Sequence, residues 1–157
     1  MKLARAIHFD ESDTRVYSNS ARTGEWCVSG GFEFSNWSEA DLDGKAKQAF
    51  SNGWFGLETS GRVTFVAVAK VTSQEVSHLE GLLADHFVTY YGAPSKELAI
   101  PVASDELQAM ADLCDEHDDN TLLVVSRELT EAGVKETFRI IDPEEAETAA
   151  KAFELKE

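Results

Sequence analysis

The chain of 157 residues is poor in cysteine and proline, and each shortage narrows the class of protein. Its two cysteines, Cys27 and Cys114, lie far apart and form no CxxC or CxxH pattern. This excludes a disulfide-dense small domain, and free thiols are expected. Three prolines and ten glycines without a period exclude a collagen-like repeat.

Basic residues are also scarce, with 14 Lys and Arg against 29 Asp and Glu, which gives a net charge of −15. Such a protein is repelled by phosphate-rich surfaces, so we expect no nucleic acid partner and no anionic membrane surface. Residues 1–70 carry a net charge of only −1, whereas residues 71–157 carry −14. The acidic half is either a solvated surface or a face that leaves the near-neutral half for docking.

Long apolar runs and cofactor motifs are missing as well. No run approaches the roughly 18 apolar residues of a membrane span. The first residues, interrupted by Arg5 and His8, lack the pattern of a signal peptide. We therefore expect a cytoplasmic protein. GxGxxG, GxxxxGK[ST] and GxSxG motifs do not occur, so no cofactor is expected.

What is present is enough apolar sequence, 43%, to build a core, and the length fits one domain over residues 1–157. Short hairpin links favour antiparallel pairing, so we predict an α+β fold with a mostly antiparallel sheet and about four helices packed on it. The segment at 25–34 carries Gly30-Gly31, which predicts a hairpin turn or a bulge. Strands are predicted at 2–9, 25–34, 63–71, 121–129 and 134–141, a turn at Ser60-Gly61, and helices that begin at Ser38, Thr72, Ser104 and Pro143.

Aromatic residues concentrate between Phe32 and Phe55, which hold six of the fifteen in the chain. Trp37, Trp54 and Phe55 sit at the ends of predicted elements, and aromatic side chains are enriched at interface hot spots. We predict that these three contact a partner, either another protein or a second copy. Replacing Trp54 or Phe55 with alanine would then abolish association without unfolding. The alternative is an ordinary aromatic core.

Two other groups of residues could carry chemistry. His8, Cys27 and His86 are polar groups beside predicted apolar surfaces and are candidates for lining a ligand pocket. Cys114 and His117 stand three apart in an acidic segment, where they could share a helix face as metal ligands. The preferred interpretation is a core cysteine beside an acidic turn with no metal, since Cys114 falls on the apolar stripe of its helix.

Several segments together resemble a known family: GEWCVSGGFEF, LDGKAKQAFSNGWFGLE, VTFVAVAKV, YYGAP, LCDEH and ETFRIID. They are similar to small bacterial proteins grouped as a domain of unknown function. The resemblance implies one bacterial cytoplasmic domain and transfers no activity, cofactor or site.

The leading hypothesis is a non-enzymatic accessory or protein-interaction module. The first alternative is a small-molecule-binding domain or enzyme with a pocket between sheet and helices. The second is a metal-binding module.

Overall fold

The strand predicted at the start of the chain lies in the middle of the sheet. In the computed structural model, which describes residues 1–9 and 15–145, β1 (Lys2–Ile7) pairs antiparallel with β2 (Trp26–Val28) and β5 (Phe65–Lys70). Ala4 faces Cys27 on one side and Val68 on the other. The first strand of the chain therefore joins the two halves of the sheet.

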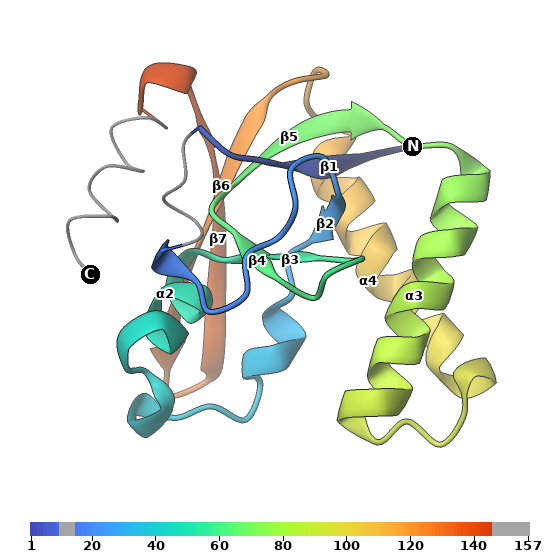
Figure 1. The fold of residues 1–157 in the computed structure, drawn as a ribbon, viewed down its shortest axis with the longest axis horizontal. Helices are drawn as coiled ribbons and strands as arrows, with labels where there is room; N and C mark the ends of the chain where they lie inside the picture. Colours follow the sequence, from blue (N-terminus) through green and yellow to red (C-terminus); the bar gives the residue numbers. More distant parts are fainter. Residues whose placement is uncertain (10–14, 146–157) are drawn as a thin grey trace.

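The sheet has seven strands in the order β4-β3-β2-β1-β5-β6-β7 (Figure 1). Every pair of neighbouring strands is antiparallel, so the predicted α+β class with an antiparallel sheet is confirmed. The remaining strands are β3 (Trp54–Gly56), β4 (Arg62–Val63), β6 (Leu122–Thr130) and β7 (Gly133–Ile141).

Two long helices, α3 (Ser73–Tyr91) and α4 (Lys96–Cys114), form a hairpin beside the sheet, and α4 contacts β1 and β2 (Figure 1). The predicted capping box starts α3. The Thr72 hydroxyl accepts from the Glu75 amide at 3.1 Å, and the Glu75 carboxylate accepts from the Thr72 amide at 3.1 Å. Across the described ranges, no helix is both long enough and apolar enough to cross a membrane.

The predicted start of the next helix at Ser104 is wrong. The helix α4 begins at Lys96, where the Ser95 hydroxyl accepts from the Leu98 amide at 3.2 Å. Pro101 lies inside the helix and removes one backbone donor. Packing of the apolar face of α4 against the sheet outweighs that loss.

The predicted strand at 25–34 is also wrong beyond Val28. Gly30, with φ 76°, forms neither a hairpin nor a bulge, and it leads the chain into a short 3-10 helix, η1 (Gly31–Phe34). A Cβ at Gly30 would lie 2.3 Å from the Cβ of Phe55, so packing against β3 fixes this bend.

Two further elements differ in detail from the prediction. The helix expected from Ser38 is divided into η2 (Glu39–Asp41) and α2 (Gly44–Asn52). The strand expected at 63–71 is broken between β4 and β5, while the C-terminal hairpin with Gly133 at φ 115° is confirmed. The helix expected from Pro143 lies outside the described residues beyond position 145.

Both faces of the central strand β5 are covered, as its continuous apolar sequence predicts. Val66 and Val68 belong to the main core with α3 and α4, whereas Phe65 and Ala67 form a smaller core with β6 and β7. This alternation follows from the two-residue period of a strand.

The burial of two aromatic side chains corrects the predicted partner surface. Trp54 and Phe55 are 0% and 1% exposed, and the Trp54 ring stacks on Phe138 at 5.6 Å. Trp37 is half-buried and meets the ring of Phe34 edge to face at 4.7 Å. Of the three predicted contact residues, only Trp37 has accessible surface.

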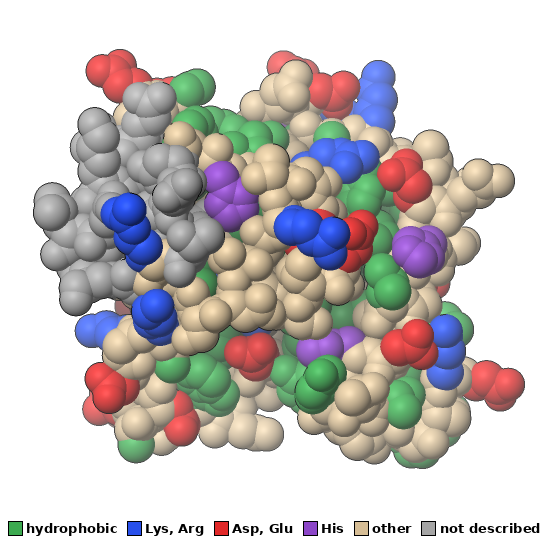
Figure 2. All heavy atoms as spheres, viewed as in Figure 1, with side chains coloured by type: hydrophobic (Ala, Val, Ile, Leu, Met, Phe, Trp, Pro, Cys, Tyr) green, Lys and Arg blue, Asp and Glu red, His purple; other side chains and the backbone are tan. Residues whose placement is uncertain are grey.

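Charged side chains are spread over the face seen in Figure 2, where lysines and arginines lie among acidic side chains rather than in one area. The expectation that the protein does not bind nucleic acid stays a prediction.

The burial of Phe55 predicts that Phe55→Ala lowers the free energy of unfolding by about 3–5 kcal/mol, because a large core side chain is deleted. Ser77→Ala, at an exposed position of α3, is the control and should change this free energy by about 0.5 kcal/mol or less. Urea unfolding followed by circular dichroism measures both. Wild-type stability in Phe55→Ala would contradict the core assignment.

Candidate functional site

Two arginine side chains are buried where η1, α2 and the strands β4 and β6 meet. The side chains of Arg62 and Arg127 are 5% and 0% exposed. Both guanidinium groups donate to the carbonyl oxygen of Gly53, at 3.1 and 2.9 Å. Both also lie over the ring of Phe34, at 4.7 and 5.1 Å from its centre. Buried charges of this kind require paired partners.

Each arginine has a carboxylate partner and several carbonyl acceptors. Arg127 pairs with Glu136 at 2.8 Å, and Arg62 pairs with Glu33 at 3.3 Å. Arg127 also donates to the carbonyl of Phe50 at 2.9 Å, near the end of α2, where helical carbonyls lack internal partners. Burial lowers the pKa of Arg62 to about 10, while the neighbouring Glu33 opposes the shift.

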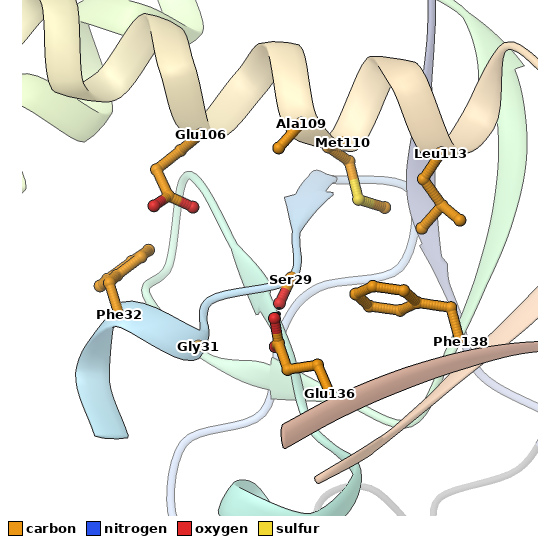
Figure 3. Close-up of a pocket in the computed structure, with 9 residues that line it drawn as sticks. All are labelled: Ser29, Gly31, Phe32, Glu106, Ala109, Met110, Leu113, Glu136 and Phe138. Atoms are coloured by element: carbon orange, nitrogen blue, oxygen red, sulfur yellow. Dashed lines mark hydrogen bonds between the residues drawn. The ribbon is translucent and has the colours of Figure 1, made fainter. Parts of the chain in front are cut away.

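Glu136 also lines a cavity of about 200 Å³, which we call the Glu106–Glu136 cavity (Figure 3). It lies between α4, β7 and the segment that joins β2 to η1. A Cβ at Gly31 would come within 2.7 Å of the Glu136 carboxylate, so glycine there leaves room for that side chain. The lining residues are Ser29, Gly31, Phe32, Glu106, Ala109, Met110, Leu113, Glu136 and Phe138.

The cavity has a polar end and an apolar end. In Figure 3 the carboxylates of Glu106 and Glu136 extend from opposite walls, from α4 and β7, and Ser29 donates its hydroxyl hydrogen to Glu136. The side chains of Met110, Leu113 and Phe138 gather at the other end.

The two carboxylates differ in electrostatic environment. Glu136 is neutralised by Arg127, whereas Glu106 has no ion pair within the described residues. Burial raises the pKa of Glu106, and the charges of Glu136 and Asp105 raise it further. The cavity therefore favours either a protonated Glu106 or a cation beside it.

The three residues predicted for a pocket do not line this cavity. His8 contacts the carbonyl of Ala21 through Nε2 at 2.8 Å, Cys27 is fully buried, and His86 lies among aromatic rings on α3. Burial raises the pKa of the Cys27 thiol well above its usual value, which keeps it protonated. A pocket between sheet and helix exists, but other residues line it.

Sequence reasoning missed Glu106, Glu136, Ser29 and Arg127. One signal was available, since Arg127 follows the apolar run LLVVS and Arg62 precedes VTFVAVA. An arginine beside a buried strand predicts a buried ion pair. The two glutamates carry no such signal, because they are two acidic residues among 29.

The second predicted cluster has a structural role. Cys114 is buried in the core, where burial raises its pKa to about 12 and disfavours the thiolate that a metal requires. Lys2 binds the following acidic turn, donating from Nζ to the His117 carbonyl at 2.7 Å and pairing with Asp119 at 3.4 Å. Over residues 1–9 and 15–145, no group of three His, Cys, Asp or Glu is placed to hold a metal ion.

The pairing of Glu136 with a buried arginine predicts that Glu136→Gln lowers the free energy of unfolding by about 1.5–3 kcal/mol, since a charge-assisted hydrogen bond is lost.

Glu106→Gln should instead raise the free energy of unfolding. Because the folded-state pKa of Glu106 is raised, its ionisation costs stability as the pH rises through that pKa.

Urea unfolding in acid and at neutral pH measures both effects. We expect Glu106→Gln to be the more stable protein at neutral pH and to lose this advantage in acid. Equal destabilisation by both substitutions would contradict the assignment.

A family model described as a family of unknown function (DUF6505) matches residues 1–156 of the chain. No curated protein and no solved structure matches it. The family match confirms the resemblance to a domain of unknown function and assigns no activity to the cavity.

Proposed function

The chain belongs to the family of unknown function DUF6505, and we propose that it is a cytoplasmic binding protein whose Glu106–Glu136 cavity holds a small organic ammonium ion. One observation carries this proposal. Glu106 is a carboxylate without an ion-pair partner among the described residues, at the polar end of a cavity whose other end is apolar. The small-molecule-binding domain, which was the first alternative from the sequence, thus becomes the preferred hypothesis.

The charges around the cavity favour a monocation. Arg127 and Glu136 neutralise each other, so an ionised Glu106 leaves one negative charge. An ammonium group beside Glu106 supplies the missing charge and favours the ionised carboxylate. Phe32, drawn close to Glu106 in Figure 3, offers an aromatic ring to the same cation.

The shape limits the size of the ligand. A dry apolar cavity of about 150 Å³ holds a benzene molecule, and this cavity measures about 200 Å³. It therefore suits one ring or a short alkyl group with a single polar arm. Met110, Leu113 and Phe138 would contact the apolar part.

Benzylamine is the probe for this proposal, and its binding can be measured by isothermal titration calorimetry. We expect Glu106→Gln to weaken binding by roughly 10- to 150-fold, which corresponds to a charge-assisted hydrogen bond of about 1.5–3 kcal/mol. Glu97→Gln, the same substitution at an exposed position of α4 outside the lining, is the matched control and should bind nearly as the wild type does. Affinity should rise with pH as Glu106 loses its proton.

Benzyl alcohol has a similar shape without the charge and should bind far more weakly than benzylamine. The proposal fails if the wild type does not bind benzylamine, if Glu106→Gln binds it equally well, or if the alcohol binds as tightly as the amine.

A second candidate is the protein-interaction module that the sequence favoured, with a second copy of this chain as the partner. The observation in its favour is that large apolar side chains are exposed on α3 and α4, where Tyr90, Leu98 and Val102 are 70%, 63% and 52% exposed. Exposed apolar side chains mark interaction sites when they form a contiguous patch.

Sedimentation equilibrium tests this candidate. We expect the wild type to dimerise and Leu98→Asp to stay monomeric, because a charge would be buried in the interface. Ser77→Asp, at an exposed position in the first half of α3, is the control and should dimerise. A monomeric wild type at every concentration would remove this candidate.

A further inference from the structure

Ser60, which lines a second cleft, is hydrogen-bonded to His86. The distance between Ser60 Oγ and His86 Nδ1 is 3.3 Å. Ser60 has φ 60°, in the left-handed region that residues other than glycine rarely adopt. Strained backbone of this kind concentrates at functional sites and persists only where the surroundings enforce it.

The turn that carries Ser60 is held by a buried acid. Glu25, which is almost fully buried, accepts through its carboxylate from the amides of Glu58 and Thr59, both at 3.1 Å. It also accepts from the Thr59 hydroxyl at 2.9 Å, and the Ser60 amide donates to the Gly56 carbonyl at 2.9 Å. These bonds hold the backbone that leads into Ser60 and point to an enforced conformation.

His86 is surrounded by aromatic rings. The ring centres of Phe55 and Tyr90 lie 5.0 and 4.8 Å from that of His86, and Nε2 is buried with no hydrogen-bond partner in the described structure. An N–H at Nε2 would lie among these rings, whose faces carry partial negative charge. That tautomer leaves Nδ1 free to accept the Ser60 proton.

Burial and the charge of Arg62 favour the neutral form of His86. Burial lowers its pKa, Glu33 on η1 opposes this, and Arg62 on β4 lowers the pKa further. On α3 itself, Asp85 is adjacent in sequence and the Tyr91 ring lies 5.6 Å away. A neutral histidine at neutral pH is the form that a general base requires.

Ser60 lines a cleft of about 250 Å³ whose local charge differs in sign from that of the whole protein. Arg62 and Lys45 contribute two positive charges and Glu33 one negative charge, so the local balance is +1. Trp37 adds an apolar side. The cleft therefore suits a small monoanion with an apolar part.

We propose that Ser60 accepts an acyl group from a small ester that carries an anionic group, with His86 as the base. The Ser60 proton moves to His86 Nδ1 as the bond between Oγ and the acyl carbon forms. The ester C–O bond breaks, and the leaving alcohol takes the proton from His86. Water then hydrolyses the acyl-serine, which releases a carboxylic acid and restores the Ser60 hydroxyl.

The probe is 4-nitrophenyl hydrogen succinate, an anionic activated ester. We expect the protein to release nitrophenolate and to carry one succinyl group on the peptide that contains Ser60, as detected by mass spectrometry. His86→Gln should slow acylation by roughly 10²- to 10⁴-fold, the contribution of a positioned base. Ser35→Ala, at an exposed serine outside both clefts, is the control and should react as the wild type does.

Ser60→Gly is the decisive variant, because glycine adopts φ 60° without strain. It should abolish acylation while its thermal unfolding temperature stays equal to or above that of the wild type. The wild-type rate should rise with pH and reach a plateau at a lower pH than an ordinary histidine would give. The proposal is overturned if the wild type is not acylated, if the label lies on another residue, or if Ser60→Gly reacts at the wild-type rate.

Discussion

The carbonyl oxygen of Gly53 accepts hydrogen bonds from two buried guanidinium groups, and much of the structure is arranged around this contact. Two like charges in one apolar region repel each other and lose hydration, so each needs its own carboxylate and carbonyl partners. Arg127 joins β6 to the end of α2 and, through Glu136, to β7. Arg62 joins β4 to η1. Residues of η1 line both clefts, and this network holds that short helix in place.

The sequence predicts those parts of the fold that depend on local chemistry. The capping box at Thr72, the glycine of the last hairpin and the apolar run of β5 each follow from neighbouring residues. The errors come from contacts distant in sequence. Gly30 bends away from a hairpin because β3 packs against it, and the start of α4 includes Pro101 because its apolar face is covered by the sheet.

The candidate sites were less predictable than the fold. The sequence indicates His86 as a pocket candidate but predicts its partner, Ser60, only as part of a turn. The two residues are 26 positions apart in the sequence and come together only in the fold. Glu106 and Glu136 come together only because α4 crosses near β7, an arrangement that depends on strand order. Trp54 and Phe55 are of the aromatic types that are common at interfaces, but other elements of the fold bury both side chains in the core. Sequence pattern indicates which residues are buried or polar, whereas the sites depend on which of them become neighbours.

The central place of β1 has a consequence for how the chain is made. Of the seven strands, β1 is synthesised first, yet its residue Lys2 pairs with Lys70, and the helix α4 that covers it is synthesised later still. During that interval its edge toward β5 offers unpaired backbone groups to any other chain. Long-range pairing of this kind folds slowly and exposes strand edges to aggregation. The folding of the nascent chain therefore depends on the interval between the synthesis of β1 and the synthesis of β5.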